Sequence, residues 1–135
     1  MVQEGFLSAC DQLSAAVDAV QFERLRWSRT EAPMLAHLVE LAQGAVEDRE
    51  DIELTDEGSG GAIRRYIVKV HGHRIFAVVI SLEGTTVSIQ AEAIARSPYK
   101  IATQATLTSE FKAFDAALMA AALGTLFERV KTKPD

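Results

Sequence analysis

The sequence predicts a single α+β domain over residues 1–135, made of two N-terminal helices, an antiparallel meander sheet of four to five strands, and a long C-terminal helix packed on that sheet. Three observations predict this fold class. Apolar residues recur with a helical period near both ends of the chain, and β-branched runs punctuated by glycines fill residues 62–94. The chain of 135 residues is also long enough to bury a core without disulfide or metal staples.

The amino-acid composition of the chain argues against several classes of function. A net charge of -5 argues against a general nucleic-acid binder, which needs a basic surface to neutralise phosphates. The lone Cys10 rules out a disulfide framework and favours a reducing compartment. The first residues lack the basic and apolar regions of a signal peptide, and the longest uncharged stretch, residues 116–127, is too short to span a bilayer. We therefore expect a cytoplasmic protein without a nucleic-acid partner, membrane association or cofactor.

The first helix is predicted over residues 6–22. Apolar side chains recur there at steps of four and three residues, as in an amphipathic helix. The apolar stripe consists of Phe6, Cys10, Leu13, Val17 and Val20. Such a stripe must dock on something. The following residues 23–29 have the composition of a connection, with three arginines in solvent and Trp27 as an anchor.

A second helix is predicted to begin near Thr30, whose hydroxyl can cap the first free amides, with Glu31 favourable in the first turn. Its inner face is formed by Leu35, Leu38, Val39, Ala42 and Val46. The acidic residues 47–57 that follow contain the alternating pair Ile52 and Leu54. This pattern predicts a short edge strand with a charged outer side.

Residues 62–94 contain three β-rich runs separated at Gly72 and Gly84, the pattern of an antiparallel meander. In the third run the odd positions are the apolar ones, so they are expected to face the core. A two-residue turn at Glu83 and Gly84 then sets Leu82 opposite Thr85, and it pairs Ile80 with Val87, Val78 with Ile89 and Phe76 with Ala91.

In the first run the even positions form the better core set, because Arg65 and Lys69 occupy the odd face. This core set is Tyr66, Val68 and Val70. Even positions must then pair with even positions of the next strand. This pairing requires a loop with an odd number of residues, most simply the three residues His71, Gly72 and His73.

The opposite face of the sheet is too apolar to be left in water. Its apolar residues are Ile63, Ile67, Ile75, Ala77 and Val79. Either one of the chain's own helices covers this face, or a partner subunit or a ligand does. We favour a homo-oligomer, most simply a dimer, because a two-fold contact matches equal apolar patches. The five residues are therefore interface candidates.

After the meander, Pro98 breaks the sheet. A weak alternation predicts a fifth strand at Ile101, Thr103, Ala105 and Leu107. A closing helix is predicted over residues 108–131, with a broad apolar face fit to cover the sheet. Asp115 falls among large apolar residues near its start. If it is buried, it needs a cationic partner such as Arg64 or Arg65.

Two candidate sites follow from these positions. His71 and His73 could supply two ligands to a metal, although a zinc site needs three or four. A ligand pocket between the sheet and the closing helix would be lined by Arg64, Arg65, Tyr66, Tyr99 and Asp115. The glycine-rich residues 58–61 could bind an anion together with the two arginines.

No stretch places a nucleophile, a base and an orienting group together, so the sequence favours a non-enzymatic protein. Two function classes remain open. The first is a small protein-interaction or homo-oligomerising domain that binds a protein partner. The alternative is a small-ligand or anion-binding domain, with or without catalytic activity, whose pocket lies between the sheet and the C-terminal helix.

Overall fold

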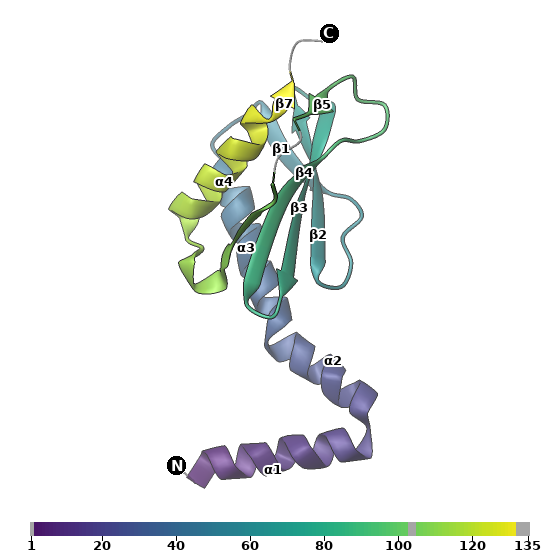
Figure 1. The fold of residues 1–135 in the computed structure, drawn as a ribbon, viewed down its shortest axis with the longest axis vertical. Coiled ribbons are helices and arrows are strands. Elements are labelled where there is room, and N and C mark those ends of the chain that lie inside the picture. Colours follow the sequence, from purple (N-terminus) through teal and green to yellow (C-terminus); the bar gives the residue numbers. More distant parts are fainter. Residues whose placement is uncertain (1, 103–104, 132–135) are drawn as a thin grey trace. The chain divides into compact units, whose positions relative to one another are not determined.

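The computed structural model describes residues 2–102 and 105–131. It confirms the predicted fold class: helices lie toward both ends of the sequence and an antiparallel sheet of five strands lies between them (Figure 1). The chain divides into two compact units, residues 1–33 and residues 34–135.

The N-terminal unit consists of two helices separated by a single residue. α1 (Val2–Val17) ends before Asp18, and α2 (Ala19–Arg29) begins directly after it. Asp18 has extended backbone angles, and its Oδ1 accepts a hydrogen bond from the Gln21 amide at 3.1 Å, so it caps α2. The prediction of one helix over residues 6–22 and a connection over residues 23–29 is therefore wrong. The cap starts a new helix that continues through the arginines.

α3 (Glu31–Val46) begins where the second helix was predicted, but Thr30 has a different role. Its hydroxyl donates to the Arg26 carbonyl at 2.7 Å, so it closes the C-terminal end of α2. The predicted inner face of this helix is confirmed: Val39 is half-buried, and the buried side chains are Leu35, Leu38, Ala42 and Val46.

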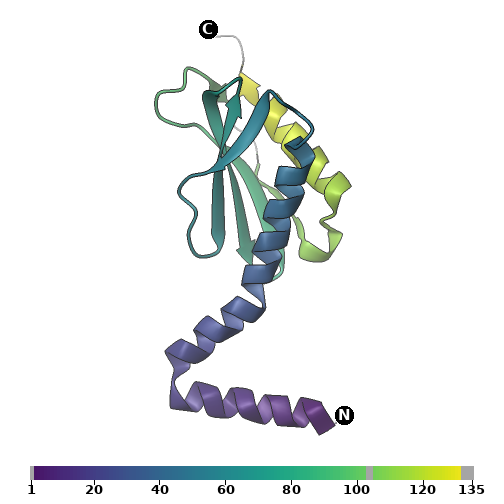
Figure 2. The same cartoon turned by 180° about the vertical axis from the view of Figure 1, so that it is seen from behind.

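The C-terminal unit is built on the five-stranded sheet, in which all neighbours are antiparallel. In spatial order the strands are β1 (Ile52–Asp56), β2 (Ile63–Val70), β3 (His73–Glu83), β4 (Thr86–Glu92) and β6 (Leu107–Glu110). A separate two-stranded sheet pairs β5 (Lys100–Ile101) with β7 (Val130–Lys131). Both α3 and α4 (Ala116–Glu128) cover one face of the five-stranded sheet, as the two opposite views show (Figure 1, Figure 2).

The main core lies between that face and the two helices. The ring of Phe76 on β3 meets the ring of Phe127 on α4 edge to face, with centroids 5.7 Å apart. Gln43 of α3 donates its Nε2 to the carbonyl of Leu54 at 3.1 Å, which ties the helix to the edge strand. Of the predicted core positions, Thr85 is exposed in the turn, Val70 and Ala91 are half-buried, and the buried ones are Tyr66, Val68, Phe76, Val78, Ile80, Leu82, Val87 and Ile89.

The hairpin between β3 and β4 turns one residue later than predicted, at Gly84 and Thr85. The observed pairs are Glu83 with Thr86, Leu82 with Val87, Ile80 with Ile89 and Val78 with Ala91. Gly84 has a φ of +62° at the first turn position, a conformation that glycine adopts without strain. The predicted pairs are wrong by two residues. Because a shift of two preserves the face, the core set of both strands is nevertheless correct.

The hairpin between β2 and β3 pairs even positions with even positions, as predicted, but its loop differs from the predicted one. His71 and Gly72 alone form the turn, with φ values of 52° and 78°, so the predicted three-residue loop is wrong. A β-bulge then leaves Ile75 of β3 unpaired, and beyond it Val68 pairs with Phe76. The odd residue thus lies inside the strand instead of the loop, and even positions still pair with even positions.

The C-terminal helix is shorter than predicted, because residues 107–110 complete the edge of the sheet as β6. A short 3-10 turn, η1 (Phe111–Ala113), follows this strand. Asp115 then caps α4, with its Oδ1 accepting from the Leu118 amide at 2.8 Å. The predicted start near residue 108 is wrong. Asp115 is exposed, so it does not need the arginine partner that burial would have required.

The predicted fifth strand is divided between the two sheets. Ile101 belongs to β5, Leu107 belongs to β6, and Thr103 lies outside the described residues. At the other end of α4, residues 130–131 leave the helix and pair with β5.

Candidate interaction surface

The second face of the five-stranded sheet, away from α3 and α4, is closed largely by the chain itself. Ile67 and Ala77 are fully buried and pack with Ile94, which follows β4. Val79 is buried as well, whereas Ile63 is 45% exposed. These are four of the five predicted interface residues. Little apolar surface of this face is therefore accessible to a partner.

Arg65 holds the loop that follows β1 against β2. Its Nη1 donates to the Glu57 carbonyl at 3.0 Å, and its Nε donates to Glu92 at 3.3 Å. A Cβ at Gly58, where φ is +92°, would lie 3.2 Å from the Cδ of Arg65. Glycine therefore allows both the turn and the close approach. The guanidinium of Arg65 is already bonded to acceptors of the chain.

The five residues predicted to line a ligand pocket do not converge. Arg64 donates its Nη1 to the carbonyls of Gly61 and Ile63, at 2.8 and 2.9 Å, so it folds back on its own loop. Tyr66 is buried between β1 and β3, and burial raises the pKa of its hydroxyl. Asp115 serves as the cap of α4. Tyr99 is the one member of this set that lines a cavity next to the C-terminal helix.

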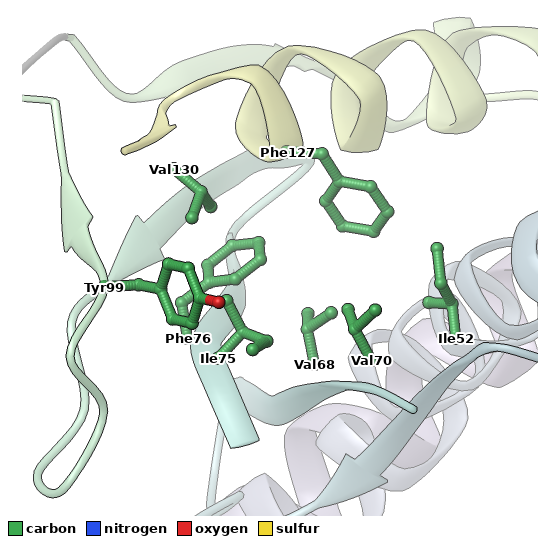
Figure 3. A pocket seen from close by; sticks show the side chains of 8 residues that line it. All are labelled: Ile52, Val68, Val70, Ile75, Phe76, Tyr99, Phe127 and Val130. Carbon is green, nitrogen blue, oxygen red and sulfur yellow. The ribbon is translucent and has the colours of Figure 1, made fainter. Parts of the chain in front are cut away.

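That cavity has a volume of about 190 Å³ and lies between the sheet, α4 and β7 (Figure 3). Its wall is apolar except for the hydroxyl of Tyr99, and the other lining residues are Ile52, Val68, Val70, Ile75, Phe76, Phe127 and Val130. A dry apolar cavity of roughly 150 Å³ is large enough for benzene.

The fifth predicted interface residue, Ile75, is buried in the wall of this cavity. The β-bulge explains its position, because a bulged residue is turned away from the regular alternation of the strand. The hydroxyl of Ser97 donates to the Ile75 carbonyl at 2.7 Å and so satisfies a backbone group at the bulge.

His71 and His73 are both exposed at the hairpin between β2 and β3. His71 occupies the turn, and His73 begins β3. Within residues 2–102 and 105–131, no group of three or more His, Cys, Asp or Glu side chains is placed to hold a metal ion. The histidine pair therefore has no third protein ligand in that part of the chain.

The N-terminal unit exposes a large apolar surface. Six of its large apolar residues have exposed fractions between 49% and 78%, and no residue from 4 to 33 is buried. We define the N-terminal apolar surface as Phe6, Leu7, Leu13, Val17, Val20 and Leu25. Among the described residues, Ile63 is the one other large apolar residue that is comparably exposed.

The sequence showed part of this surface but not its exposure. The period of the apolar residues predicts the stripe of α1, and this stripe was expected to dock on something that the sequence does not identify. Leu7 and Leu25 were missed, the latter because residues 23–29 were assigned to a connection. The polar composition of residues 23–29 could have indicated this exposure, because the segment has few apolar side chains that could cover the stripe of α1.

A hollow of about 360 Å³ lies between α1 and α2. Its apolar part is formed by Cys10, Phe22 and Leu25, and the thiol of Cys10 is free and exposed. Charged residues of opposite sign also line it: Asp11 comes from α1, and Arg26 and Arg29 come from α2. The hollow is therefore apolar with charged flanks, like the centre and rim of a protein interface.

The fold and this surface define an α+β protein with a separate helical unit whose apolar face is open. Comparisons with protein-family models, with curated proteins and with solved structures gave no match to the chain. In the part of the chain that the structure describes, no helix combines the length and apolar character that crossing a membrane requires.

Proposed function

We propose that this protein is a small, non-enzymatic, cytoplasmic interaction domain that forms homo-oligomers through its N-terminal apolar surface. The observation that carries the proposal is the exposure of six large apolar side chains in a unit where no residue from 4 to 33 is buried. Helices of 16 and 11 residues are marginal in water unless an apolar face is packed. Association with another chain supplies that packing, so folding of this unit is coupled to binding.

A protein surface suits α1 better than a lipid surface. Helices that lie on membranes carry lysine and arginine on their polar face, where they attract anionic lipids. α1 contains neither residue type, and its charged residues are Glu4 and Asp11. Anionic lipids would repel such a helix.

Replacing Leu13 by aspartate tests this proposal. Leu13 is 67% exposed in the single chain and central in the stripe, so Leu13→Asp places a charge where a partner would bury an apolar side chain. We expect the dissociation constant of the oligomer to rise at least about 100-fold, which corresponds to roughly 2.7 kcal/mol. Light scattering over a dilution series would measure the solution mass of both chains.

Gln12→Asp is the matched control, because it adds the same charge to the neighbouring exposed position of α1 without removing apolar surface. This variant should stay oligomeric under the same conditions. A native chain that remains at 14.7 kDa throughout the dilution series would contradict the proposal. Equal behaviour of the two variants would contradict the assignment of the surface.

The cavity beside Tyr99 supports the alternative function, binding of a small apolar ligand. Among the side chains of its eight lining residues there is one polar atom, the Tyr99 hydroxyl oxygen (Figure 3). An apolar pocket with one orienting group is typical of sites for small molecules that are mostly apolar. The chemistry of the wall does not suit an anion, because no arginine or lysine lines it.

Benzene and phenol are the probes for this alternative. At about ten times its dissociation constant, a ligand that binds only the folded state stabilises it by about 1.4 kcal/mol, which raises Tm by roughly 5 °C. We expect Tyr99→Phe to reduce the shift given by phenol and to leave the shift given by benzene. Thermal unfolding without any shift for either probe would count against the ligand function.

A further inference from the structure

We infer that α1 of one copy lies against α2 of a second copy, with Asp11 of each chain paired to Arg29 of the other. This inference rests on the proposed function and adds the arrangement of the two chains. It identifies the occupant of the hollow between α1 and α2 as the apolar stripe of the second copy.

The charges of α1 exclude a contact between the two α1 helices as the best arrangement. Glu4 and Asp11, the charged residues of α1, are seven residues apart and therefore lie on one side of the helix, and Asp11 lines the hollow together with Cys10 of the stripe. No lysine or arginine precedes Arg24 in the sequence. Two antiparallel α1 helices would bring acidic edges side by side, and like charges at an interface oppose association. In a parallel pair the acidic edge would meet no basic side chain, because α1 contains neither lysine nor arginine.

α2 carries the complementary charge. Its sequence contains Arg24, Arg26 and Arg29 against the single acidic residue Glu23. Arg26 is paired, with Glu23 at 3.0 Å and with Glu31 at 2.9 Å. Among the described residues, neither Arg24 nor Arg29 takes part in an ion pair. α2 therefore offers unpaired positive charge to an acidic helix.

The hollow brings these charges together with apolar surface. Asp11 and Arg29 both line it, yet they form no ion pair with each other in the single chain. Phe22 and Leu25 form its apolar wall on α2. A second α1 that lies on the α2 side of this space buries its stripe against these two side chains, and its Asp11 reaches Arg29.

The contact is self-complementary, as a two-fold interface requires, because every chain supplies both an acidic α1 and a basic α2. The area is also sufficient. Six exposed side chains at roughly 100 Å² each give about 600 Å² of apolar surface per chain. Two chains then bury about 1,200 Å², which reaches the lower bound for stable protein interfaces.

Charge reversal in two separate full-length chains tests the pairing between copies. In a dimer of Asp11→Lys chains, the introduced lysines face Arg29 of the other copy. In a dimer of Arg29→Glu chains, the introduced glutamates face Asp11. Each variant alone should dimerise about tenfold more weakly than the native chain. In a mixed dimer both contacts are attractive again, so an equimolar mixture should regain native affinity as a 1:1 heterodimer.

Light scattering gives the mass of the mixture, and native mass spectrometry gives its composition. Arg24→Glu is the matched control, because Arg24 lies on α2 outside the hollow. This variant keeps both native contacts and should dimerise with itself. In a mixed dimer with Asp11→Lys only one of the two contacts is attractive, so no 1:1 heterodimer of native affinity should form. Three outcomes overturn the pairing: single variants as tight as the native dimer, a mixture as weak as the single variants, or equal rescue by Arg24→Glu.

The same experiment distinguishes this failure from failure of the proposed function. A native dimer that Leu13→Asp dissociates, but whose charge variants do not rescue each other, leaves the proposed function standing and removes the pairing of α1 with α2. A native chain that is monomeric at all concentrations overturns both.

Discussion

Phe76→Ala is expected to destabilise the C-terminal unit by about 3–5 kcal/mol, the range for removing a large aromatic side chain from a packed core. Phe76 is 2% exposed, and its ring meets the ring of Phe127 at 5.7 Å. The substitution removes this contact and enlarges a cavity that the native chain already has beside it. Denaturant unfolding at low protein concentration would measure the loss.

Phe6→Ala is the control, because it makes the same chemical change in the N-terminal unit, where Phe6 is 66% exposed. At concentrations below the dissociation constant of the oligomer, this variant should unfold at the same denaturant concentration as the native chain. An equal loss in both variants would show that Phe6 is covered within one chain, and the account of the N-terminal apolar surface would then be wrong.

The faces of the elements could be predicted from the sequence because they depend on local periodicity. A strand alternates every residue and a helix returns every three to four residues, so Leu35 and Leu38 could be placed on one face of a helix and Val78 and Ile80 on one face of a strand. The error at the turn after Glu83 did not matter for burial, since a displacement by two residues leaves each side chain on its face.

The boundaries could not be predicted with the same success, because the competing choices differ by small energies. An aspartate can lie on the surface of a continuous helix or cap a new one, and a cap contributes only about 1 kcal/mol. Asp18 and Asp115 both proved to be caps. The bulge at Ile75 is another such choice. One extra residue in the strand and one extra residue in the loop give the same pairing of even positions with even positions.

The candidate site depended on burial, which periodicity does not determine. Two apolar surfaces needed a cover, the stripe that begins at Phe6 and the second sheet face around Ala77. The stripe is exposed, whereas on the sheet face Ile67 and Ala77 pack with Ile94. Such closures join residues far apart in sequence, and no local pattern of residues encodes them.

Slow reaction of the Cys10 thiol at high protein concentration is the second large effect that we expect. Cys10 is the only cysteine, it is exposed in the single chain, and it lines the hollow that the second copy would fill. If only the dissociated chain reacts, the rate with a chromogenic disulfide reagent follows the fraction of monomer. At about 100 times the dissociation constant, that fraction predicts a reaction about tenfold slower than in dilute solution.

The concentration dependence of this rate tests most directly whether a second copy covers the N-terminal apolar surface. We predict a thiol that is protected at high concentration, becomes reactive on dilution, and is reactive at all of these concentrations in Leu13→Asp. A native thiol that reacts at the same fast rate over the whole series, as in an unfolded chain, would contradict it.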